Sequence, residues 1–264
     1  MQISNKVFVV TGAGGGIGRE LVLNLLSKGA SVAAVDLNLD ALNGTYEAAG
    51  EKKEKVSLHQ VNLSERMEVE ALPQQVIDFH GAVDAIINNA GIIQPFIPVH
   101  ELDYEKIKLV MDVNFYGTLY MVKTFLPHLL ERPEAHITNI SSMGGFLPVP
   151  GQSIYGASKA AVKLMTEGLH SELKDTNVNV TVVFPGGVGT DITKNSGADS
   201  GKKKEATPEQ MKKLLTPKEA AEIIIKGTED NQYRVLAGKD AKLMDRIYRL
   251  NPKKAAALIA EKLK

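Results

Sequence analysis

Short runs rich in β-branched residues alternate with longer segments of helical periodicity along most of this 264-residue chain. The runs are almost continuously apolar, as strands are when both faces of a sheet are covered. A strand, a helix and a further strand in succession form a right-handed crossover, which makes the two strands parallel. The pattern therefore predicts an α/β fold with one parallel sheet between two layers of helices.

The expected architecture is a Rossmann-type doubly wound sheet of about seven strands in three α/β/α layers. Strands are expected at Val7–Val10, Ser31–Val35, Val56–Val61, Asp84–Asn88, His136–Ile140, Val178–Phe184 and Tyr233–Leu236. Helices are expected at Ile17–Lys28, from Leu39, from Ser64 to about Phe79, at Leu102–Leu130 with Pro127 as a candidate end, and at Gln152–Lys174.

Length and composition restrict the other classes of protein. A chain of this size with 44% hydrophobic residues suits one domain over residues 1–264, and no linker divides it. The formal net charge is zero, which gives no reason to expect nucleic acid as a partner. The absence of cysteine excludes disulfides and thiolate catalysis. Without a signal-like segment or an apolar run near the roughly 18 residues of a membrane span, we expect a cytoplasmic protein.

A glycine-rich turn, TGAGGGIG at residues 11–18, joins the first expected strand to the first helix. Glycines allow a sharp turn and the close approach of a pyrophosphate, and the helix N-terminus adds N–H donors. Such a turn is weak evidence alone, but its position between strand and helix strengthens the interpretation as a dinucleotide site.

Asp36 ends the second expected strand, 18 residues after Gly18. A carboxylate there can accept hydrogen bonds from the adenosine ribose and repel a 2′-phosphate. The next residue is Leu37, and position 15 is glycine, so neither offers a cation to neutralise a 2′-phosphate. The charge argument therefore favours NAD over NADP.

Tyr155 and Lys159 are four residues apart on an expected helix and share one face. The spacing is unspecific, because Tyr104 and Lys108 repeat it on what we interpret as a solvated helix surface. The first pair differs in its surroundings: it follows a glycine- and proline-rich loop, with Ser142 at the end of the fifth strand, where open α/β sheets bind ligands. A tyrosine pKa near 10 would have to fall by about 2–3 pH units for proton exchange near neutrality, and a nearby ammonium favours that direction.

These motifs together resemble the short-chain dehydrogenase/reductase superfamily over about residues 5–240. They comprise TGAGGGIG at 11–18, Asp36, NNAG at 88–91, Asn114, ISS at 140–142, YGASK at 155–159 and PGGVGT at 185–190. Each could arise by chance, but their order and spacing are specific.

The resemblance implies a role for each matching residue. Tyr155 would be the catalytic acid/base, and Lys159 would bind the nicotinamide ribose and lower the tyrosine pKa. Ser142 would orient the substrate oxygen, and Asn114, on a kinked helix, would hold a proton-relaying water chain. The remaining cofactor residues would be Gly12, Gly14, Gly15, Gly16, Ile17, Gly18, Asp36, Leu37, Asn62, Leu63, Asn89, Ala90, Gly91, Pro185, Gly186, Val188 and Thr190.

Asn62 is a departure from the family, which often has aspartate at the end of the third strand; its side chain can still accept a hydrogen bond from adenine. A basic residue before Gly16, common in NADP-using members, is absent, which agrees with the charge argument.

The expected function is hydride transfer between the nicotinamide of NAD and a secondary alcohol or ketone. The substrate, beside Ser142 and Tyr155, would be lined by Ile92–Phe96, Met143–Val149, Gln152 and the loop from Asp191 to about Leu215. This lining is fairly apolar because it includes Phe96, Met143, Phe146, Leu147 and Val149. The alternative is a dinucleotide-sensing protein without turnover, since fold does not fix function. A sugar epimerase or dehydratase is disfavoured, because the chain ends soon after the seventh strand.

Two peripheral segments complete the expectations. A substrate loop at about 191–215 contains the polar stretch Asn195–Glu205, which we expect to be mobile. The tail at about 239–264 reads as helical, with a last helix from Asn251 that docks on the surface or contacts another subunit rather than a membrane. The resemblance implies a homotetramer or homodimer, and no histidines have the spacing of metal ligands.

Overall fold

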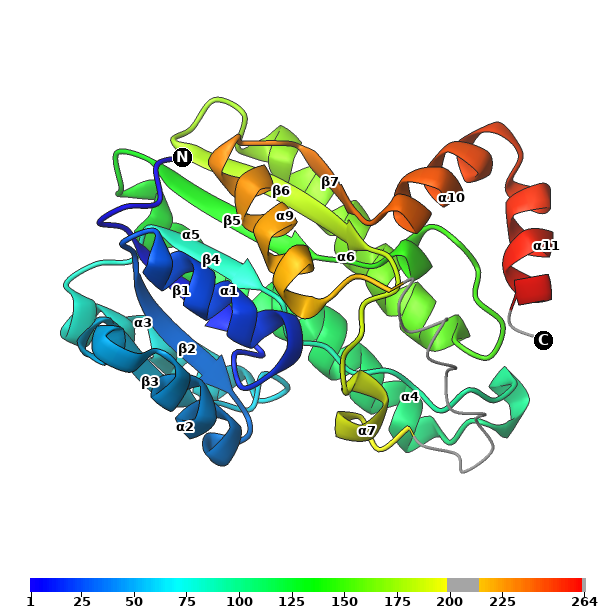
Figure 1. Ribbon diagram of the computed structural model, residues 1–264, viewed down its shortest axis with the longest axis horizontal. Coiled ribbons are helices and arrows are strands. Elements are labelled where there is room, and N and C mark those ends of the chain that lie inside the picture. The colour runs from blue at the N-terminus through cyan, green and yellow to red at the C-terminus, as the bar shows by residue number, and fades with distance from the viewer. Residues whose placement is uncertain (199–213, 263–264) are drawn as a thin grey trace.

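A computed structural model describes residues 1–198 and 214–262. Within them, seven strands form a single parallel sheet in the order β3-β2-β1-β4-β5-β6-β7. Helices cover both faces of this sheet, as Figure 1 shows. The predicted three-layer, doubly wound fold is therefore confirmed. The strand order reverses between β1 and β4, which makes this the switch point of the sheet.

Every predicted strand is present, with small shifts at its ends. The strands are β1 Val7–Thr11, β2 Ser31–Asp36, β3 Val56–Gln60, β4 Ala85–Asn88, β5 Ala135–Ile140, β6 Val178–Pro185 and β7 Arg234–Ala237. The α-helices are α1 Gly16–Ser27, α2 Leu39–Ala48, α3 Arg66–His80, α4 Tyr104–Met111, α5 Gly117–Leu130, α6 Ser153–Glu172, α7 Ile192–Asn195, α9 Pro217–Glu229, α10 Lys239–Leu250 and α11 Pro252–Lys262. Short 3₁₀ turns lie at Gly50–Lys55, Val99–Glu101 and Met143–Gly145.

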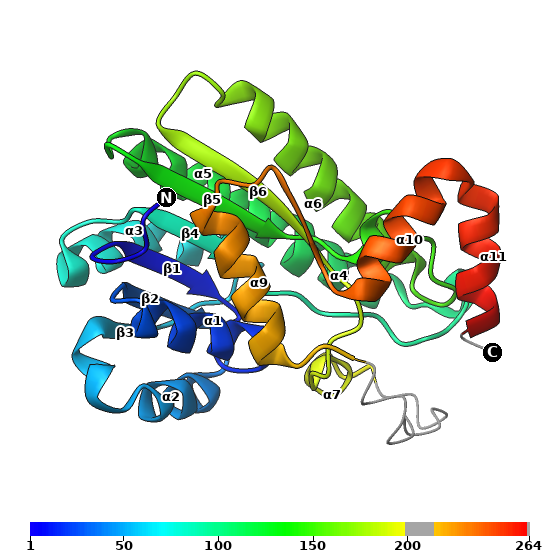
Figure 2. The ribbon, with the colours of Figure 1, turned by 45° about the horizontal axis from the view of Figure 1, so that its top comes forward.

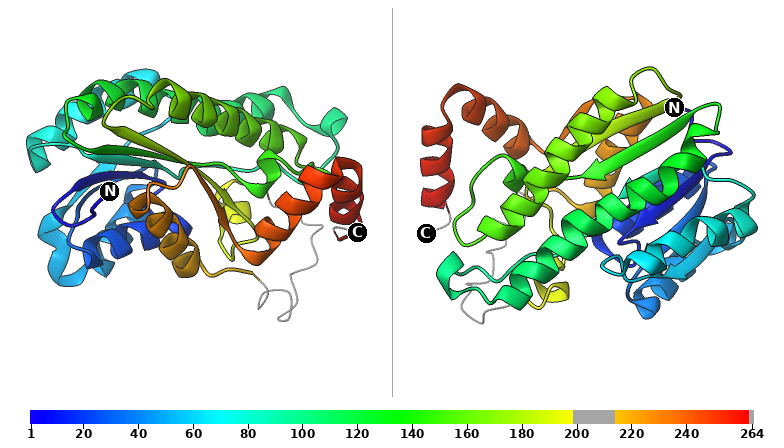
Figure 3. Two further views of the ribbon diagram at one scale, coloured as in Figure 1. Left: turned by 90° about the horizontal axis from the view of Figure 1, so that it is seen from above. Right: turned by 180° about the vertical axis from the view of Figure 1, so that it is seen from behind.

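Two apolar cores, one on each face, hold the layers together. Alternate residues of a strand point to opposite faces, so Phe8 packs with α1 and α9, whereas Val9 packs with α3 and α5. Seen from above, α1 and α9 lie below the sheet and α5 and α6 above it (Figure 3). Complete burial of both strand faces explains why the sequence shows apolar runs rather than alternation.

The long helical pattern at 102–130 is interrupted. A π-helical turn, Asp112–Tyr116, separates α4 from α5 and places Asn114 in the interior. Such turns occur mostly as bulges at functional sites. The kink implied by the family resemblance is thus confirmed. The candidate end at Pro127 is wrong, because α5 continues through Pro127 to Leu130.

The tail forms α10 and α11, which lie at the end of the molecule toward which the strands point (Figure 2). Ala255 and Ile259 of α11 and Met244 of α10 form a third apolar cluster with Leu147 of the loop after β5. The described part of the tail is thus helical and packs on the chain itself, which agrees with the first of the two roles expected for it.

Candidate active site

The glycine-rich turn after β1 is closed except at one position. A Cβ on Gly18 would lie 1.9 Å from the carbonyl oxygen of Gly12, and a Cβ on Gly12 would lie 2.9 Å from the Cα of Ala90. Gly12 also has a φ of +67°. A Cβ on Gly15 would meet nothing within 4 Å. The backbone therefore packs tightly on the segment after β4 and stays open at the start of α1, where N–H groups can receive a phosphate.

Asp36 lies beside this turn and is already engaged in hydrogen bonds. Its Oδ2 accepts from the Gly14 N–H at 2.9 Å and its Oδ1 from the Asn38 N–H at 3.0 Å. The neighbouring Leu37 is 62% exposed. The sequence thus placed Asp36 correctly at the end of β2, within reach of the glycine turn.

Arg19 is a cation at the same corner, which the sequence argument missed. One of its guanidinium nitrogens donates to the Gly14 carbonyl at 2.6 Å, and its Nε donates to Thr45 Oγ1 at 3.0 Å. Positions 15 and 37, next to the turn, are glycine and leucine and carry no charge. Residue 19 lies one helical turn after residue 15, so it returns to the same side of α1.

Asn62 and Leu63 follow β3 at the edge of this region. Asn62 Oδ1 accepts from the Ser64 N–H at 3.1 Å and from its hydroxyl at 2.8 Å. Leu63 is buried and packs in the core with α3 and α5. Leu63 thus contributes packing, whereas Asn62 stays partly exposed at the carboxyl edge of the sheet.

The NNAG segment after β4 connects the glycine turn to the tyrosine–lysine helix. Asn89 donates from Nδ2 to the Thr11 carbonyl at 3.0 Å, and the Ala90 N–H donates to Thr11 Oγ1 at 3.0 Å. On the other side, a Cβ on Gly91 would lie 3.0 Å from Lys159 Nζ. The segment therefore contacts both the glycine turn and the helix that carries Tyr155 and Lys159.

Asn114 and Lys159 are buried behind this segment. Asn114 Oδ1 accepts from the Ile92 N–H at 2.8 Å, and its Nδ2 donates to the Ile92 carbonyl and to Ser158 Oγ, each at 2.9 Å. Lys159 Nζ donates to the Ile140 carbonyl at 3.0 Å. A Cβ on Gly91 would also lie 3.2 Å from Asn114 Oδ1. The structure thus brings the predicted amide and ammonium to the same point.

Ser142 and Tyr155 meet across Gly144. A Cβ on Gly144 would lie 3.5 Å from both Ser142 Oγ and Cε1 of Tyr155. Ser141 points elsewhere, since its hydroxyl is buried and donates to the Lys159 carbonyl at 2.7 Å. The preference for Ser142 over Ser141 as the polar partner of the tyrosine therefore agrees with the geometry.

Burial acts on both titratable groups. It raises the pKa of the Tyr155 phenol, and the hydrogen bond with Ser142 partly offsets this. It lowers the pKa of Lys159 to about 8, so that the ammonium remains mostly protonated at neutral pH. The pKa direction for Tyr155 is opposite to the sequence-based expectation, because desolvation of the phenolate outweighs the favourable contacts that the chain itself supplies.

The PGGVGT segment closes the site from the side of β6. A Cβ on Gly16 would lie 3.3 Å from Cγ2 of Thr190, so this segment meets the glycine turn. Asp240 of α10 accepts from the Gly187 N–H at 2.7 Å. A Cβ on Gly186 would lie 2.2 Å from the Asp240 carboxylate. Pro185 is the last residue of β6, and Val188 pairs with Leu215 in an isolated bridge.

The described start of the predicted substrate loop contacts the segment after β4. Ser196 Oγ accepts from the Ile93 N–H at 3.0 Å, and Lys106 Nζ donates to the Ser196 carbonyl at 2.7 Å. Most of Asn195–Glu205, for which we predicted mobility, lies outside the described residues.

The predicted substrate lining lies in two places, next to the tail and at the start of α6. Met143 packs with α10 and α11 as part of the third cluster. The backbone of Phe96 comes within 3.2 Å of a Cβ on Gly151. Gln152 is buried, and its Nε2 donates to the Gln94 carbonyl at 2.8 Å. Gln152 therefore connects the loop after β4 to the loop that leads into the N-terminus of α6.

Gln94 lies in the predicted lining segment Ile92–Phe96, but its contact with α6 was not predicted. It is fully buried between these loops, and its side chain accepts from the Tyr155 N–H at 3.0 Å. The segment has no helical or strand pattern, so nothing in the local sequence indicates this contact.

The second tyrosine–lysine pair is exposed, as expected. Tyr104 is 85% exposed, and Lys108 forms an ion pair with Asp112 rather than with a site residue. In the described part of the chain, no three His, Cys, Asp or Glu side chains gather as metal ligands. No helix there has both the length and the apolar character needed to cross a membrane.

Known proteins share both the sequence pattern and the architecture. A model of the short chain dehydrogenase family matches residues 6–201. "Putative oxidoreductase SadH" of Mycobacterium tuberculosis is 36% identical over 264 residues, which cover 98% of this chain and 95% of the relative.

Two solved structures with bound cofactor are similar as well. A short chain dehydrogenase/reductase from Burkholderia phymatum in complex with NAD has a TM-score of 0.83 at 25% identity, covering 95% of this chain and 96% of that one. A short chain dehydrogenase from Burkholderia cenocepacia J2315 in complex with NADP has a TM-score of 0.81 at 26% identity, covering 98% and 99%.

Proposed function

Because the chain belongs to the short-chain dehydrogenase/reductase family of oxidoreductases, we propose that it transfers hydride between NAD and a secondary alcohol or ketone. The observation that carries this proposal is the convergence of Tyr155, Ser142, Lys159 and Asn114 beside a glycine turn. They come from different elements, α6, the end of β5 and the π-helical turn, and meet at the carboxyl edge of the sheet, where open α/β folds bind ligands.

The residues present fit a dinucleotide. The turn at Gly12 and Gly18 admits no side chain, whereas the backbone at Gly15 is open at the N-terminus of α1. In this proposal Gly14–Ile17 hold the pyrophosphate, and Asp36 and Leu37 take the adenosine ribose. Asn62, Leu63 and Asn89–Gly91 line the adenosine side, while Lys159 and Pro185–Thr190 take the nicotinamide side. When bound, the oxidised nicotinamide supplies the hydride acceptor and a positive charge.

Tyr155 is proposed to accept the hydroxyl proton of the alcohol on its phenolate, or to donate its phenolic proton in the reverse direction. The Ser142 hydroxyl holds the substrate oxygen beside the phenol. Lys159, mostly protonated at neutral pH, is a cation on the same helix face and so opposes the effect of burial on Tyr155 in the direction of the phenolate. Asn114 holds the segment after β4 by its paired bonds to Ile92 and anchors a proton path to solvent.

NAD is proposed as the preferred cofactor because the carboxylate of Asp36 faces the position of the adenosine ribose and opposes a 2′-phosphate. Similar structures contain NAD in one case and NADP in another. Arg19 acts in the opposite direction to Asp36 at this corner. We therefore propose a preference that depends on Asp36.

An apolar substrate is proposed because Met143, Phe146 and Val149 form the loop that follows Ser142 and pack with the tail. Phe96 and Gln152 stand at the other side, at the start of α6. We also propose that residues 1–264 act as one domain and that the protein assembles as a homodimer or homotetramer.

The test is NADH formation across a panel of secondary alcohols, with Tyr155→Phe as the diagnostic variant. Removing the phenolic proton should lower kcat by about 10²- to 10⁴-fold, with NADH binding, followed by fluorescence, unchanged. Tyr104→Phe is the matched control and should retain full kcat, because Tyr104 is exposed. Equal turnover by Tyr155→Phe and wild type would refute the mechanism. NADH binding without turnover of any alcohol would favour a dinucleotide sensor.

A further inference from the structure

The amino-terminal end of the catalytic helix α6 is capped from a distance. The first N–H groups of any helix have no partner within it and are usually bonded by the side chain of the N-cap residue. The N-cap residue of α6 is Gln152, whose side chain forms no such bond. It donates to the Gln94 carbonyl instead.

Gln94 supplies the missing cap. Its Oε1 accepts from the Ile154 N–H at 2.8 Å and from the Tyr155 N–H at 3.0 Å, across 60 and 61 residues of sequence. Its Nε2 donates to the Gly151 carbonyl at 3.0 Å. The residue is fully buried, so that water cannot replace these bonds if the side chain is removed.

The capped residue is the catalytic tyrosine itself. The segment that carries Gln94 also contacts the other members of the site: the Ile92 backbone binds Asn114, and Gly91 packs against Lys159 Nζ. One stretch of four residues after β4 thus contacts Asn114, Lys159 and Tyr155. A shift of this stretch would change the position of Tyr155 relative to Ser142.

The chemical type of the cap matters as well. Aspartate and glutamate are favourable at helix N-termini because their charge complements the helix dipole. Here an amide provides the acceptor without the charge, next to a tyrosine that must form a phenolate. A carboxylate in the same place would oppose that phenolate.

We propose that Gln94 is a positioning residue that fixes Tyr155 through the backbone of α6 while keeping negative charge away from its phenol. The role of Tyr155 in this inference rests on the proposed function.

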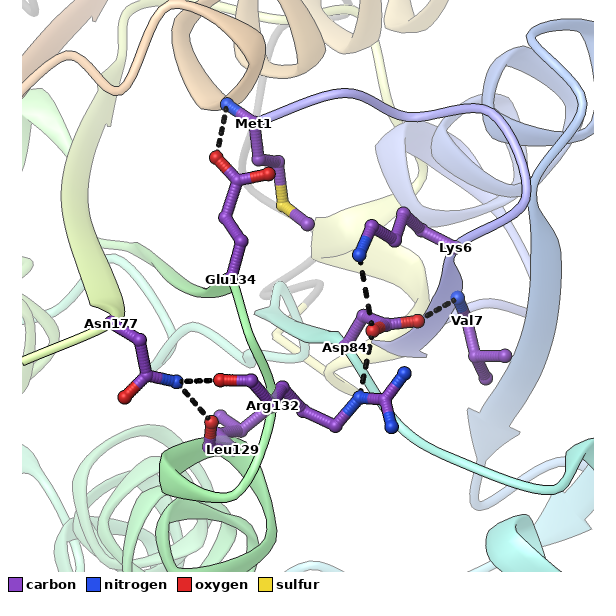
Figure 4. Close-up of polar contacts among 8 residues, drawn as sticks. All are labelled: Met1, Lys6, Val7, Asp84, Leu129, Arg132, Glu134 and Asn177. Atoms are coloured by element: carbon purple, nitrogen blue, oxygen red, sulfur yellow. Dashed lines mark hydrogen bonds and ion pairs between the residues drawn. The ribbon is translucent and has the colours of Figure 1, made fainter.

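Gln94→Leu tests the positioning. It removes the acceptor of two buried N–H groups, so kcat should fall by about 10- to 100-fold, whereas the KM for NAD should change less than about twofold. Asn177→Ala is the matched control, because its amide caps the end of α5 at the opposite edge of the sheet (Figure 4). It should lower Tm to a similar degree with kcat unchanged. If Gln94→Leu lowers Tm and leaves kcat unchanged, its role is only structural and the proposal is wrong.

Gln94→Glu tests the charge with a side chain of the same shape, although it replaces the donor to the Gly151 carbonyl by a second carboxylate oxygen. It restores the acceptor, so kcat at its own pH optimum should exceed that of Gln94→Leu at least about fivefold. The pH profile should move upward by about one pH unit, the effect expected of one charge at side-chain distance. Two charged side chains reach the segment that carries Gln94: Lys159 of α6, beside Gly91, and Lys106 of α4, through Ser196. Neither changes in these variants.

A second readout needs no substrate. The ultraviolet difference absorbance between each protein and its Tyr155→Phe counterpart follows the ionisation of this one tyrosine. Its midpoint should rise in Gln94→Glu, and an unchanged midpoint would overturn the charge part of the proposal. If wild type turns over no alcohol, the proposed function fails, while this titration still decides whether Gln94 sets the ionisation of Tyr155.

Discussion

Asp36 and Arg19 bind the same residue of the glycine turn from two directions. The Gly14 N–H donates to Asp36, and the Gly14 carbonyl accepts from Arg19. A carboxylate repels the 2′-phosphate that distinguishes NADP, whereas a guanidinium attracts it. The choice of cofactor therefore depends on which of the two side chains stands nearer the ribose.

Asp36→Ala should shift the ratio of kcat/KM for NAD to that for NADP by about 10- to 100-fold toward NADP. This is the range that one or two hydrogen bonds to a charged group provide. Adding Arg19→Leu should reverse part of the shift, since it removes the cation. Kinetics with both cofactors measure the ratios. An unchanged ratio in Asp36→Ala would show that Asp36 serves the turn alone.

The position of a site residue was predictable where it stands at a strand end or on a regular helix. It was not predictable where the residue acts through a contact with a segment distant in the sequence. Asp36, Ser142 and Lys159 stand at strand ends or on a regular helix, so spacing placed them correctly. Gln94 accepts hydrogen bonds from a helix that begins about 60 residues later, and no local sequence pattern predicts that contact. The pKa direction of Tyr155 depends on burial, which also follows from the packing of distant segments.

At the scale of elements, the turn from β1 to α1 is defined by the close approach of backbone to backbone. Gly18 lies inside α1, yet its Cα faces the Gly12 carbonyl so closely that a methyl group would overlap it. Gly15 stands three residues earlier with open space around it. Both are glycines of one motif, but of these two only Gly18 is required for packing.

Gly18→Ala should destabilise the protein by more than about 3 kcal/mol, because backbone atoms must shift to accept the new Cβ. Gly15→Ala should change the free energy of unfolding by less than about 0.5 kcal/mol, since it creates no contact. Urea unfolding without cofactor measures both. Similar losses in the two variants would contradict the packing argument.

The alternation of elements was predictable because the inner strands, such as β1, β4 and β5, are buried on both faces. The break in the long helix does not show in the helical pattern and was expected only from the family resemblance. Residues 102–130 have a helical pattern throughout, and the π-helical turn at Asp112–Tyr116 does not interrupt that pattern in the sequence. Pro127 was a misleading signal, because α5 simply continues past it for three residues to its end at Leu130.

At the scale of the molecule, the two edges of the sheet have different tasks. The proposed reaction takes place at the carboxyl edge. At the amino edge, the buried Asp84 accepts from the Val7 N–H at 2.9 Å and pairs with Arg132 at 2.9 Å and Lys6 at 3.5 Å (Figure 4). This cluster joins the starts of β1, β4 and β5.

Asp84→Asn should reduce the free energy of unfolding by about 2–3 kcal/mol, because it leaves two cations without their shared carboxylate. Turnover per folded molecule should stay unchanged, since the cluster lies at the edge away from the site. Chemical denaturation and steady-state kinetics on one preparation measure both. A loss of kcat without loss of stability would contradict this division.

Acid should also weaken the fold, through histidines. Ser57 Oγ lies 2.8 Å from Nε2 of both His59 and His80. Burial, and then the charge of His59, lowers the pKa of His80 to about 4. Burial lowers the pKa of His59 as well. In the unfolded chain these two histidines thus become protonated near pH 6.5, whereas in the folded chain they stay neutral at that pH.

The two histidines therefore do not reduce the free energy of unfolding above about pH 6.5. As the pH falls from there toward 4, each histidine lowers that free energy by at most about 1.4 kcal/mol per pH unit. His80→Gln should reduce this dependence, whereas His100→Gln, at an exposed site, should not. Urea unfolding at several pH values between 7 and 4 measures the slope. Identical slopes in wild type and His80→Gln would refute the assignment.

The docking of α10 and α11 on the loop after Ser142 has an evolutionary consequence. The glycine turn and the tyrosine–lysine helix lie within residues 6–201, which the family model matches, whereas both tail helices lie beyond them. Mutations in the tail that spare Asp240, which accepts a hydrogen bond from Gly187, would reshape one wall of the proposed substrate region without contacting a residue proposed to bind cofactor or to move a proton. We therefore expect relatives to diversify in substrate mainly through this appendage, and grafted tails to transfer selectivity between them.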